Sequence, residues 1–519
     1  QSGIYGSVEV AGICCTAHDL TRYSTGAKVV GPLSRQLIFV RSGVADVMVL
    51  DQECIRTDII DEAKKVGTRV ITTIDQVCAG LPDMTKNPIE SVVKELVSGN
   101  TPAVLIHNPV KAGELAVKVA LEIAPIRRAS SILNEQEILD AVLRCKNCGR
   151  CRRGCPIDLP IDEAVYAAHE KNFDLLAQIY DQCLNCGRCE SECPEHIPIV
   201  SAIRVAAMEK IRNEKYKMRS GRGPIKDTEI RNVGRPIVFG EIPGVIAFVG
   251  CANYPNGNKE LVEMADEFAK RRYIVVASGC AAMDIARYKD ENGQTLYEKY
   301  PGDFDAGCIV NTGSCVSNSH IIGAAVKIAN IFAKRRLRGN FEEIADYILN
   351  RIGAVAIAWG AQHQKAAAIA TGANRLGIPV ILGPQGVKYR RAYLGRADKK
   401  ENWIIYNART GEKVYGGPSP EHLLYVTETK EETIVIAARL VMRPNDTSKG
   451  RMIKLSHYID LHQKFYGILP EDLHLFVRNE ADLPITMKDQ LLKVLKEKGW
   501  EPMEIPDPTL LERQIVKRE

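Results

Sequence analysis

Two copies of one cysteine motif constrain this chain of 519 residues more strongly than any other feature. In each copy two residues separate the first three cysteines, and three more residues precede a fourth cysteine that is followed by proline. The copies comprise Cys145, Cys148, Cys151 and Cys155, and then Cys183, Cys186, Cys189 and Cys193. This is the spacing of bacterial ferredoxins, in which three thiolates bind one [4Fe–4S] cluster and the fourth binds its neighbour. We therefore expect one cluster on Cys145, Cys148, Cys151 and Cys193, and a second on Cys183, Cys186, Cys189 and Cys155.

The spacing within each motif suits a cubane cluster better than a single metal ion. Three closely spaced thiolates allow one loop to wrap three corners of a cube, and Gly149 and Gly187 allow the backbone to turn close to it. A zinc site is the alternative, but zinc ligands usually come as two separated pairs. Two tandem motifs with trailing prolines favour iron–sulfur clusters, and hence electron transfer.

The composition agrees with a cytoplasmic metal protein. The first residues, QSGIYGSVEV, have neither the basic nor the apolar region of a signal peptide, so we expect a cytoplasmic chain. They also lack an initiator Met and run quickly into a strand-like stretch, so we expect the later part of a longer protein or a processed product. Disulfides are rare in the cytoplasm, so those of the sixteen cysteines that are clustered are interpreted as metal ligands or catalytic groups.

Charge and hydropathy exclude two classes of partner. The 69 basic and 64 acidic residues give a net charge of +5, which is too nearly balanced to predict nucleic-acid binding. No apolar run reaches the ~18 residues that a membrane span requires.

Short apolar runs alternate with amphipathic stretches on both sides of the cysteine motifs, which is typical of parallel sheets covered by helices. We expect strands at 37–40, 46–50, 69–73, 103–107, 245–250, 273–279, 307–313, 354–360 and 378–383. The predicted fold class is α/β, with two Rossmann-like doubly wound domains and a helical, ferredoxin-like domain inserted between them. The expected boundaries are 1–128, 129–235 for the insertion, 236–400, and 401–519 for a mixed α/β C-terminal extension.

Five of the remaining cysteines lie just beyond expected strands, namely Cys15 (with its neighbour Cys14), Cys54, Cys251, Cys280 and Cys315. In open parallel sheets, ligands bind outside the carboxyl ends of the strands, so these cysteines are candidates for one shared site. The alternative is that they are buried as small apolar side chains, as cysteine often is. For Cys78 and Cys308, which lack this context, we expect simple packing.

At these residues the chain resembles the nickel-dependent carbon monoxide dehydrogenases. It is most similar to the archaeal type, the alpha subunits of acetyl-CoA decarbonylase/synthase complexes. The matching segments, in the order of the family, are GICCTAHD (12–19), LDQECI (50–55), FVGCANYPN (248–256), ASGCAAMD (277–284), NTGSCVSN (311–318) and AQHQKA (361–366).

The resemblance implies a Ni–4Fe–S cluster with a specific set of ligands. It assigns Cys15 to the iron outside the cubane, with Cys14 as a neighbouring or alternate ligand, and Cys315 to nickel. The cubane irons are assigned to Cys54, Cys251 and Cys280. Lys365 matches a lysine that donates a hydrogen bond to bound CO2 and assists proton transfer. The family's histidine ligand is expected upstream of this chain.

The implied activity is the reversible oxidation of CO with water to CO2, two protons and two electrons. The electrons would leave through the [4Fe–4S] clusters to ferredoxin, as part of acetyl-CoA synthesis or cleavage. The implied assembly is a homodimer with a small accessory subunit and acetyl-CoA synthase subunits. Two alternatives remain: a non-catalytic electron-transfer subunit with about eight irons, and a hybrid-cluster-type protein without nickel.

Overall fold

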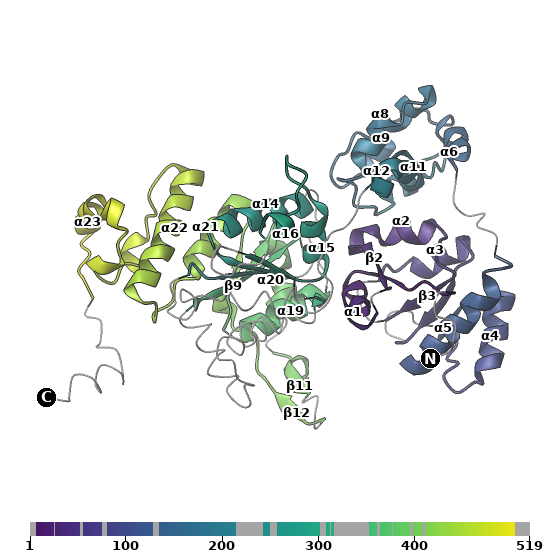
Figure 1. The fold of residues 1–519 in the computed structure, drawn as a ribbon, viewed down its shortest axis with the longest axis horizontal. Helices are drawn as coiled ribbons and strands as arrows, with labels where there is room; N and C mark the ends of the chain where they lie inside the picture. Colours follow the sequence, from purple (N-terminus) through teal and green to yellow (C-terminus); the bar gives the residue numbers. More distant parts are fainter. Residues whose placement is uncertain are drawn as a thin grey trace.

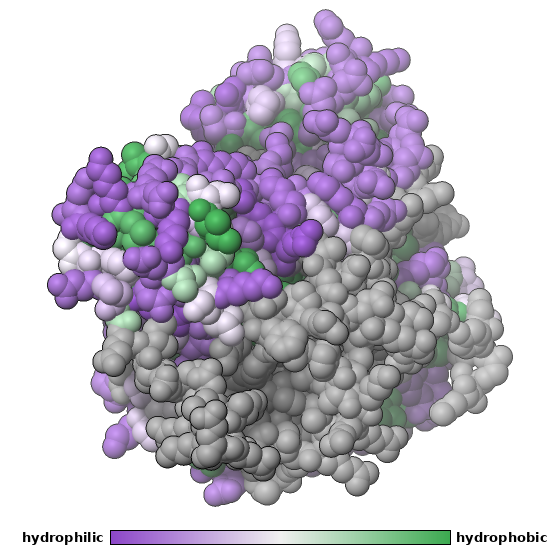
Figure 2. Space-filling view, turned by 60° about the vertical axis from the view of Figure 1, so that its left-hand side comes forward, coloured by the Kyte–Doolittle hydropathy of each residue, from purple (hydrophilic) through white to green (hydrophobic). Residues whose placement is uncertain are grey.

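The computed structural model describes residues 7–24, 26–51, 55–74, 80–127, 134–213, 242–249, 257–300, 308–311, 313–315, 352–360, 364–375, 377–394, 398–406 and 411–503. In these residues the chain is an α/β protein with parallel sheets (Figure 1). None of the described helices is both long enough and apolar enough to cross a bilayer. The face in Figure 2 is mainly hydrophilic where it is not grey, with apolar groups in small separate areas.

The N-terminal part contains a three-stranded parallel sheet in the order β3-β4-β5 and a separate parallel pair, β1-β2. The strands are β1 (Ala11–Ile13), β2 (Lys28–Gly31), β3 (Val47–Leu50), β4 (Arg69–Thr72) and β5 (Ala103–Leu105). The helices are α1 (Cys15–Tyr23), α2 (Gln36–Arg41), α3 (Ile59–Lys65), α4 (Ile89–Ser98) and α5 (Pro109–Ile123). Ile71 and Val104 of the sheet pack on Leu96 and Leu115 of the helices and form one apolar core.

The strand expected at residues 37–40 is wrong, because these residues lie in helix α2. A short apolar run does not by itself distinguish a buried strand from a buried helical turn. Here Leu37 and Ile38 pack into the core of the cysteine-motif segment, whereas Val40 packs into the sheet unit. A helix that faces both neighbours buries all three side chains, and the 3₁₀ turn η1 (Leu33–Arg35) leads directly into it.

Residues 134–213, which carry the cysteine motifs, are helical with no strand. The helices are α6 (Glu135–Val142), α7 (Arg150–Gly154), α8 (Ile161–Ala167), α9 (Asp174–Ile179), α10 (Arg188–Ser191), α11 (Ile199–Ala206) and α12 (Met208–Asn213). In Figure 1 this segment lies above α2 and α3. Its small core combines aliphatic side chains such as Ile138 and Leu176 with Cys189 and Cys193. The cysteines are thus part of what holds the segment together.

The largest sheet has six parallel strands in the order β13-β10-β9-β6-β7-β8. The strands are β6 (Val245–Phe248), β7 (Ile274–Ala277), β8 (Cys308–Asn311), β9 (Ala354–Trp359), β10 (Val380–Gly383) and β13 (Leu424–Val426). They are covered by α14 (Gly257–Lys270), α15 (Gly279–Arg287), α16 (Leu296–Lys299), α19 (Gln364–Arg375) and α20 (Gly386–Leu394). Strand β13 lies beyond the expected boundary at residue 400, so that boundary separates an edge strand from its sheet. Residues 320–336, whose amphipathic pattern predicts a helix, lie outside the described residues.

The C-terminal residues contain a hairpin, β11 (Ile404–Tyr406) and β12 (Lys413–Tyr415), and three long helices, α21 (Lys430–Leu440), α22 (Ser448–Tyr466) and α23 (Lys488–Glu497). These helices share one core with the six-stranded sheet, since Val441, Leu455 and Leu495 belong to the same buried cluster as Phe248 and Trp359. The C-terminal helices therefore extend the second α/β unit and do not form an independent body.

Candidate metal centres

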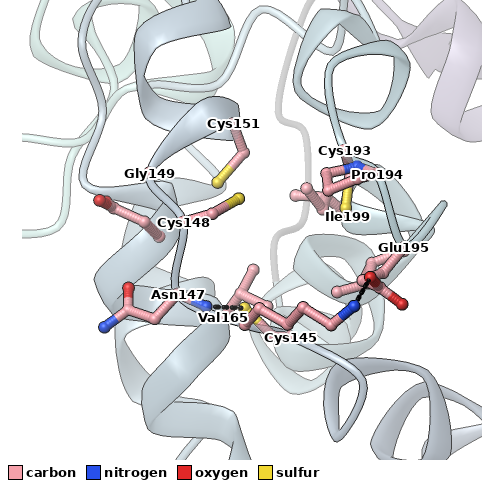
Figure 3. A pocket seen from close by; sticks show the side chains of 13 residues that line it. Cys145, Asn147, Cys148, Gly149, Cys151, Val165, Cys193, Pro194, Glu195 and Ile199 are labelled. Atoms are coloured by element: carbon pink, nitrogen blue, oxygen red, sulfur yellow. Dashed lines mark hydrogen bonds and ion pairs between the residues drawn. The ribbon is translucent and has the colours of Figure 1, made fainter.

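The first candidate centre is a pocket lined by Cys145, Cys148, Cys151 and Cys193, the four cysteines that spacing assigns to one cluster. Cys148 and Cys151 lie on one side, Cys193 enters from the second motif on the other, and Cys145 lies below them in this view (Figure 3). Cys193 is buried, whereas Cys148 is exposed, so this centre lies near the surface. The salt bridge from Lys146 to Glu195, with 2.5 Å between Nζ and Oε1, joins the two walls of the pocket.

The two motifs share one backbone geometry. Asn147 and Asn185 have φ angles of 47° and 53°, and Gly149 and Gly187 have φ angles of 68° and 78°. The left-handed residues turn the loop so that amides point inward. The N–H of Asn147 donates to Sγ of Cys145 at 3.4 Å, and the N–H of Asn185 donates to Sγ of Cys183 at 3.3 Å. Such hydrogen bonds stabilise the negative charge of a thiolate-bound cluster.

The sequence predicted that the two glycines allow these turns, but the role of the two asparagines was not predicted. A signal was present, because both motifs read Cys-x-Asn-Cys-Gly-Arg-Cys and asparagine is, after glycine, a residue that readily adopts a positive φ.

The second candidate set comprises Cys183, Cys186, Cys189 and Cys155. Cys155 and Cys186 both lie within electrostatic range of the Cys183 thiol. Cys189 is buried in the core of the segment, and Cys186 is exposed. The short helices α7 and α10, which follow the two motifs, lie against each other. The structure therefore brings each fourth cysteine to the other motif's trio.

Burial makes these thiols poor acids when no metal is bound. It raises the pKa of Cys151 and of Cys183 to about 11, and it raises the pKa of Cys189 further. The thiols therefore carry protons at neutral pH, and a bound metal must displace those protons.

Within the described residues, no three Cys, His, Asp or Glu side chains converge closely enough to hold one ion. The inward-pointing thiols and amide donors around an opening fit a group larger than an ion, as a cubane is.

A separate cluster of buried cysteines joins three distant parts of the chain. Cys14 and Cys15 follow β1, Cys280 lies in the first turn of α15 after β7, and Cys315 lies beyond β8. The Sγ atoms of Cys14 and Cys280 are 3.2 Å apart, and those of Cys14 and Cys15 are 3.8 Å apart. All four are at most 8% exposed, which is too little for solvent-facing thiols. Strand ends from both α/β units thus meet at one place.

Backbone amides and helix ends surround these four sulfur atoms. The N–H of Leu33 donates to Sγ of Cys280 at 3.2 Å, and the N–H of Cys315 donates to Sγ of Cys15 at 3.1 Å. Cys15 and Cys280 each occupy the first turn of a nine-residue helix, where the backbone dipole favours negative charge. These amides and helix ends can therefore stabilise negative charge on the sulfur atoms. The Sγ of Cys14 contacts the Sγ atoms of both Cys280 and Cys15.

Gly279 forms the floor of this site. Its φ is +53°, and a Cβ placed on it would lie 2.2 Å from Sγ of Cys315. Its N–H donates to the carbonyl of Gly313 at 2.7 Å, and its own carbonyl accepts a 3.0 Å hydrogen bond from Nε2 of His18. His18 therefore anchors the turn that presents Cys280.

Three other expected site residues have no described side chain. Cys54 and Cys251 lie outside the described residues. The backbone of Lys365 lies in the first turn of α19, just after β9, but the structure does not describe its side chain. Of the two cysteines expected to pack simply, Cys78 lies outside the described residues and Cys308 begins β8.

Two polar residues near these cysteines carried no sequence signal. Arg35 is buried beneath the ring of Tyr180, with its guanidinium carbon 3.8 Å from the ring centre. Asp284 lies one helical turn after Cys280. Burial and the thiol of Cys280 raise the pKa of Asp284 to about 8, against the opposing charges of Arg287 and Arg35.

The chain belongs to the Prismane/CO dehydrogenase family, whose model matches residues 3–396. It is 57% identical over 510 residues to the acetyl-CoA decarbonylase/synthase complex subunit alpha of Methanothermobacter thermautotrophicus, covering 98% of this chain and 65% of that protein. It is 54% identical over 507 residues to subunit alpha 1 of the same complex from Archaeoglobus fulgidus, covering 96% and 63%. The chain thus spans just under two thirds of the length of these relatives.

Among solved structures, carbon monoxide dehydrogenase IV from Carboxydothermus hydrogenoformans is similar with a TM-score of 0.41 and 18% sequence identity. The match covers 83% of this chain and 53% of that one.

Proposed function

We propose that this chain is the catalytic part of a nickel–iron carbon monoxide dehydrogenase that oxidises CO with water to CO2, two protons and two electrons, reversibly. The observation that carries the proposal is the buried meeting of Cys14, Cys15, Cys280 and Cys315 at the carboxyl ends of strands from both α/β units. A purely structural role would not require four sulfurs to share one site with inward amide donors. Membership of the Prismane/CO dehydrogenase family agrees with this activity.

The residues proposed to hold the nickel–iron–sulfur group are Cys15, Cys54, Cys251, Cys280 and Cys315, together with a histidine upstream of this chain. When bound, the group supplies a soft metal that binds CO and a Lewis acid that lowers the pKa of water. Cys14 would replace or support Cys15. Lys365 would donate a hydrogen bond to CO2 and carry a proton. The amides of Leu33 and Cys315 would offset negative charge on the sulfurs.

The helical segment would act as a ferredoxin-like domain inserted between two Rossmann-like domains, with two [4Fe–4S] clusters that carry the electrons away. We propose ferredoxin as the acceptor. The assembly would contain two copies of the chain, a small accessory subunit and acetyl-CoA synthase subunits, within the cytoplasm. The names of the two relatives, both complex subunits, support a multi-subunit assembly.

A hybrid-cluster-type protein is the second candidate, because the name of the matching family covers both prismane and CO dehydrogenase proteins. Such a protein would bind iron, sulfide and oxygen but no nickel. The metal content therefore distinguishes the two candidates more directly than any fold comparison.

Metal analysis of the protein purified without oxygen tests the proposal. We expect about twelve irons and one nickel per chain once the upstream histidine is present. About eight irons without nickel would instead indicate an electron-transfer subunit. Clusters beyond the described site would add iron, so nickel is the deciding metal, and its absence from protein matured with nickel would overturn the proposal.

Two cysteine variants separate the two kinds of centre. Cys315→Ala should remove nickel and lower the rate of CO oxidation at least 100-fold. It should leave the ferredoxin-type EPR signals intact. Cys148→Ala, at the exposed corner of the first cluster, should alter one ferredoxin-type signal and leave nickel in place. If either variant removed both the nickel and a ferredoxin-type EPR signal, the two centres would not be separate.

A further inference from the structure

The two cysteine motifs share a spacing but differ in charge. Residues 144–153, around the first motif, contain five basic residues and no acidic one. The equivalent positions of the second motif, 182–191, contain one basic residue, Arg188, and one acidic residue, Glu190. Because both loops have the same backbone turns, the shared fold does not require the additional cations of the first motif.

The second motif is turned towards the N-terminal sheet unit. Glu190 pairs with Arg41 of α2. Nη1 and Nη2 of Arg56 each donate to the carbonyl of Cys186 at 3.4 Å. The polar groups around the exposed cysteine of this motif therefore have partners from the same chain.

The first motif faces solvent instead. In Figure 1, helix α8, which follows it, lies on the side of the segment away from α2. Cys148 is exposed, and Nη2 of Arg153 donates to its carbonyl at 3.3 Å. Arg144 and Arg150 each directly precede a cysteine that lines the pocket of Figure 3. All three arginines are exposed, and they lie around the first cluster site.

These three arginines lack a carboxylate partner. The other two cations of the stretch, Lys146 and Arg152, pair with carboxylates of the same segment. Within the part of the chain that the structure describes, no carboxylate forms an ion pair with Arg144, Arg150 or Arg153. Clustered cations repel one another and attract an approaching anionic surface. We call Arg144, Arg150 and Arg153 the basic face.

The position of the basic face favours one kind of anionic partner. Electron transfer requires close approach to a cluster, and Cys148 is the one exposed cysteine of the four that line the first site. Complexes of electron-transfer proteins are small and transient, so a few charges can orient them. Residues 144–155 contain no aromatic side chain on which a nucleic-acid base could stack. An acidic redox protein therefore fits this surface better than a nucleic acid does.

We propose that the basic face is the docking surface for a small acidic electron-transfer protein, which receives electrons one at a time from the first cluster. This rests on the proposed function, which supplies the electrons. In the step, one electron leaves the reduced [4Fe–4S] cluster on Cys145, Cys148, Cys151 and Cys193 and enters the oxidised iron–sulfur group of the partner. The first cluster is oxidised, the partner is reduced, and no bond or proton moves.

The test measures electron transfer from the full chain, loaded with iron–sulfur clusters and reduced without oxygen, to an acidic bacterial two-[4Fe–4S] ferredoxin. Excess reductant is removed, and rapid mixing gives the second-order rate constant. We expect Arg144→Glu/Arg150→Glu to lower this rate constant about tenfold or more at about 0.05 M salt. The difference from the parent protein should nearly disappear at about 0.5 M salt, because salt screens exposed charges.

Two milder variants separate charge from folding. Arg144→Gln/Arg150→Gln removes the charges without reversing them and should give an intermediate rate constant. Arg144→Lys/Arg150→Lys keeps the charges and should react like the parent protein. The ferredoxin-type EPR signals should be present in both variants, since neither arginine is a cluster ligand.

Two controls locate the surface. Lys493→Glu/Lys496→Glu makes the same change of charge at exposed positions of α23, far from the cysteine-motif segment in Figure 1, and should leave the rate constant unchanged. Arg188→Glu changes the equivalent exposed position of the second motif and should lower the rate constant less than Arg150→Glu does.

Three outcomes would overturn the proposal. The first is an unchanged rate constant in Arg144→Glu/Arg150→Glu with intact EPR signals, and the second is an equal loss in either control. The third is tighter binding of a short DNA duplex than of the ferredoxin at the same salt concentration.

The electrons in this test come from a chemical reductant, so neither nickel nor CO is needed. The docking surface can therefore fail while the proposed function stands. Protein that transfers electrons at the expected rates but neither binds nickel nor oxidises CO would contradict the proposed function alone.

Discussion

At the scale of single residues, Gly279 shows how closely the dispersed cysteines are packed. The residue combines a positive φ, two backbone hydrogen bonds to distant segments and a position beneath the Cys315 sulfur. Each of these constraints alone would tolerate some variation, but together they leave no space for a Cβ. A small residue in the first turn of α15 is therefore required by the packing of the Cys315 sulfur as well as by the turn.

We expect Gly279→Ala to destabilise the protein by about 1–3 kcal/mol and to lower its nickel content. The methyl group must push the Cys315 sulfur away, since only 2.2 Å is available. Gly293→Ala is the matched control, because Gly293 has a φ of +72° and nothing within 4 Å of its Cβ position. It should cost about 1 kcal/mol from backbone strain alone and leave nickel unchanged. Thermal unfolding and metal analysis measure both effects, and equal losses in the two variants would contradict this account.

At the scale of elements, the buried carboxylate of Glu267 joins helix α14 to helix α22. It accepts from Lys464 of α22 at 2.8 Å, and it also pairs with Lys270 at the end of its own helix and with Arg271 just beyond it. Burial alone would raise the pKa of Glu267, but the hydrogen bonds and charges of these three cations outweigh it and lower the pKa to about 2. The C-terminal helices are thus held to the six-stranded sheet by charge as well as by apolar packing.

This carboxylate should make stability depend on pH. Because the folded pKa lies below the unfolded one, the contribution is complete above about pH 4.5 and is lost as the pH falls towards 2. It amounts to at most about 3 kcal/mol. We expect Glu267→Gln to be less stable than the parent protein at pH 6 and to approach it at pH 3, measured by thermal unfolding. Glu114→Gln, in an exposed pair with Lys118, should differ little at either pH.

At the scale of the whole molecule, Arg41 connects the N-terminal sheet unit to the cysteine-motif segment. Its Nε lies 2.7 Å from Oε2 of Glu62 in α3, and its Nη1 pairs with Glu190 in α10. Glu190 also accepts from the N–H of Val200 at 2.8 Å, so the contact reaches α11 as well. The position of the cysteine-motif segment relative to the N-terminal sheet unit depends on such contacts.

We expect Arg41→Ala to lower the stability of this junction by about 2 kcal/mol, because it leaves two partly buried carboxylates without their shared cation. Amide hydrogens of α10 and α11 should then exchange faster, as measured by hydrogen–deuterium exchange. Lys28→Ala removes a pair with Glu9 in which both side chains are more than half exposed, and it should cost less than about 1 kcal/mol. Unchanged exchange in α10 after Arg41→Ala would mean that apolar packing alone holds the segment.

The sequence by itself determined the local chemistry of this protein. The spacing of Cys145, Cys148 and Cys151 needs only a short loop, so three proposed cluster ligands could be picked out from the order of residues alone. The parallel strands were predictable for a similar reason, since buried strands such as β6 and β9 are apolar along their whole length. The strand predicted at 37–40 was wrong, because the environment of so short an apolar run, and not its composition, decides between strand and helix.

Only the tertiary structure decided which distant groups meet. The rule that ligands bind at the carboxyl ends of strands suggested that Cys15, Cys280 and Cys315 could converge, but their separation depends on how two sheets are placed. Arg35 had no signal at all, because its burial arises where η1, the residues before Cys183 and α15 come together. Local spacing is a property of the chain, whereas the solvation and charge of a site are properties of everything packed around it.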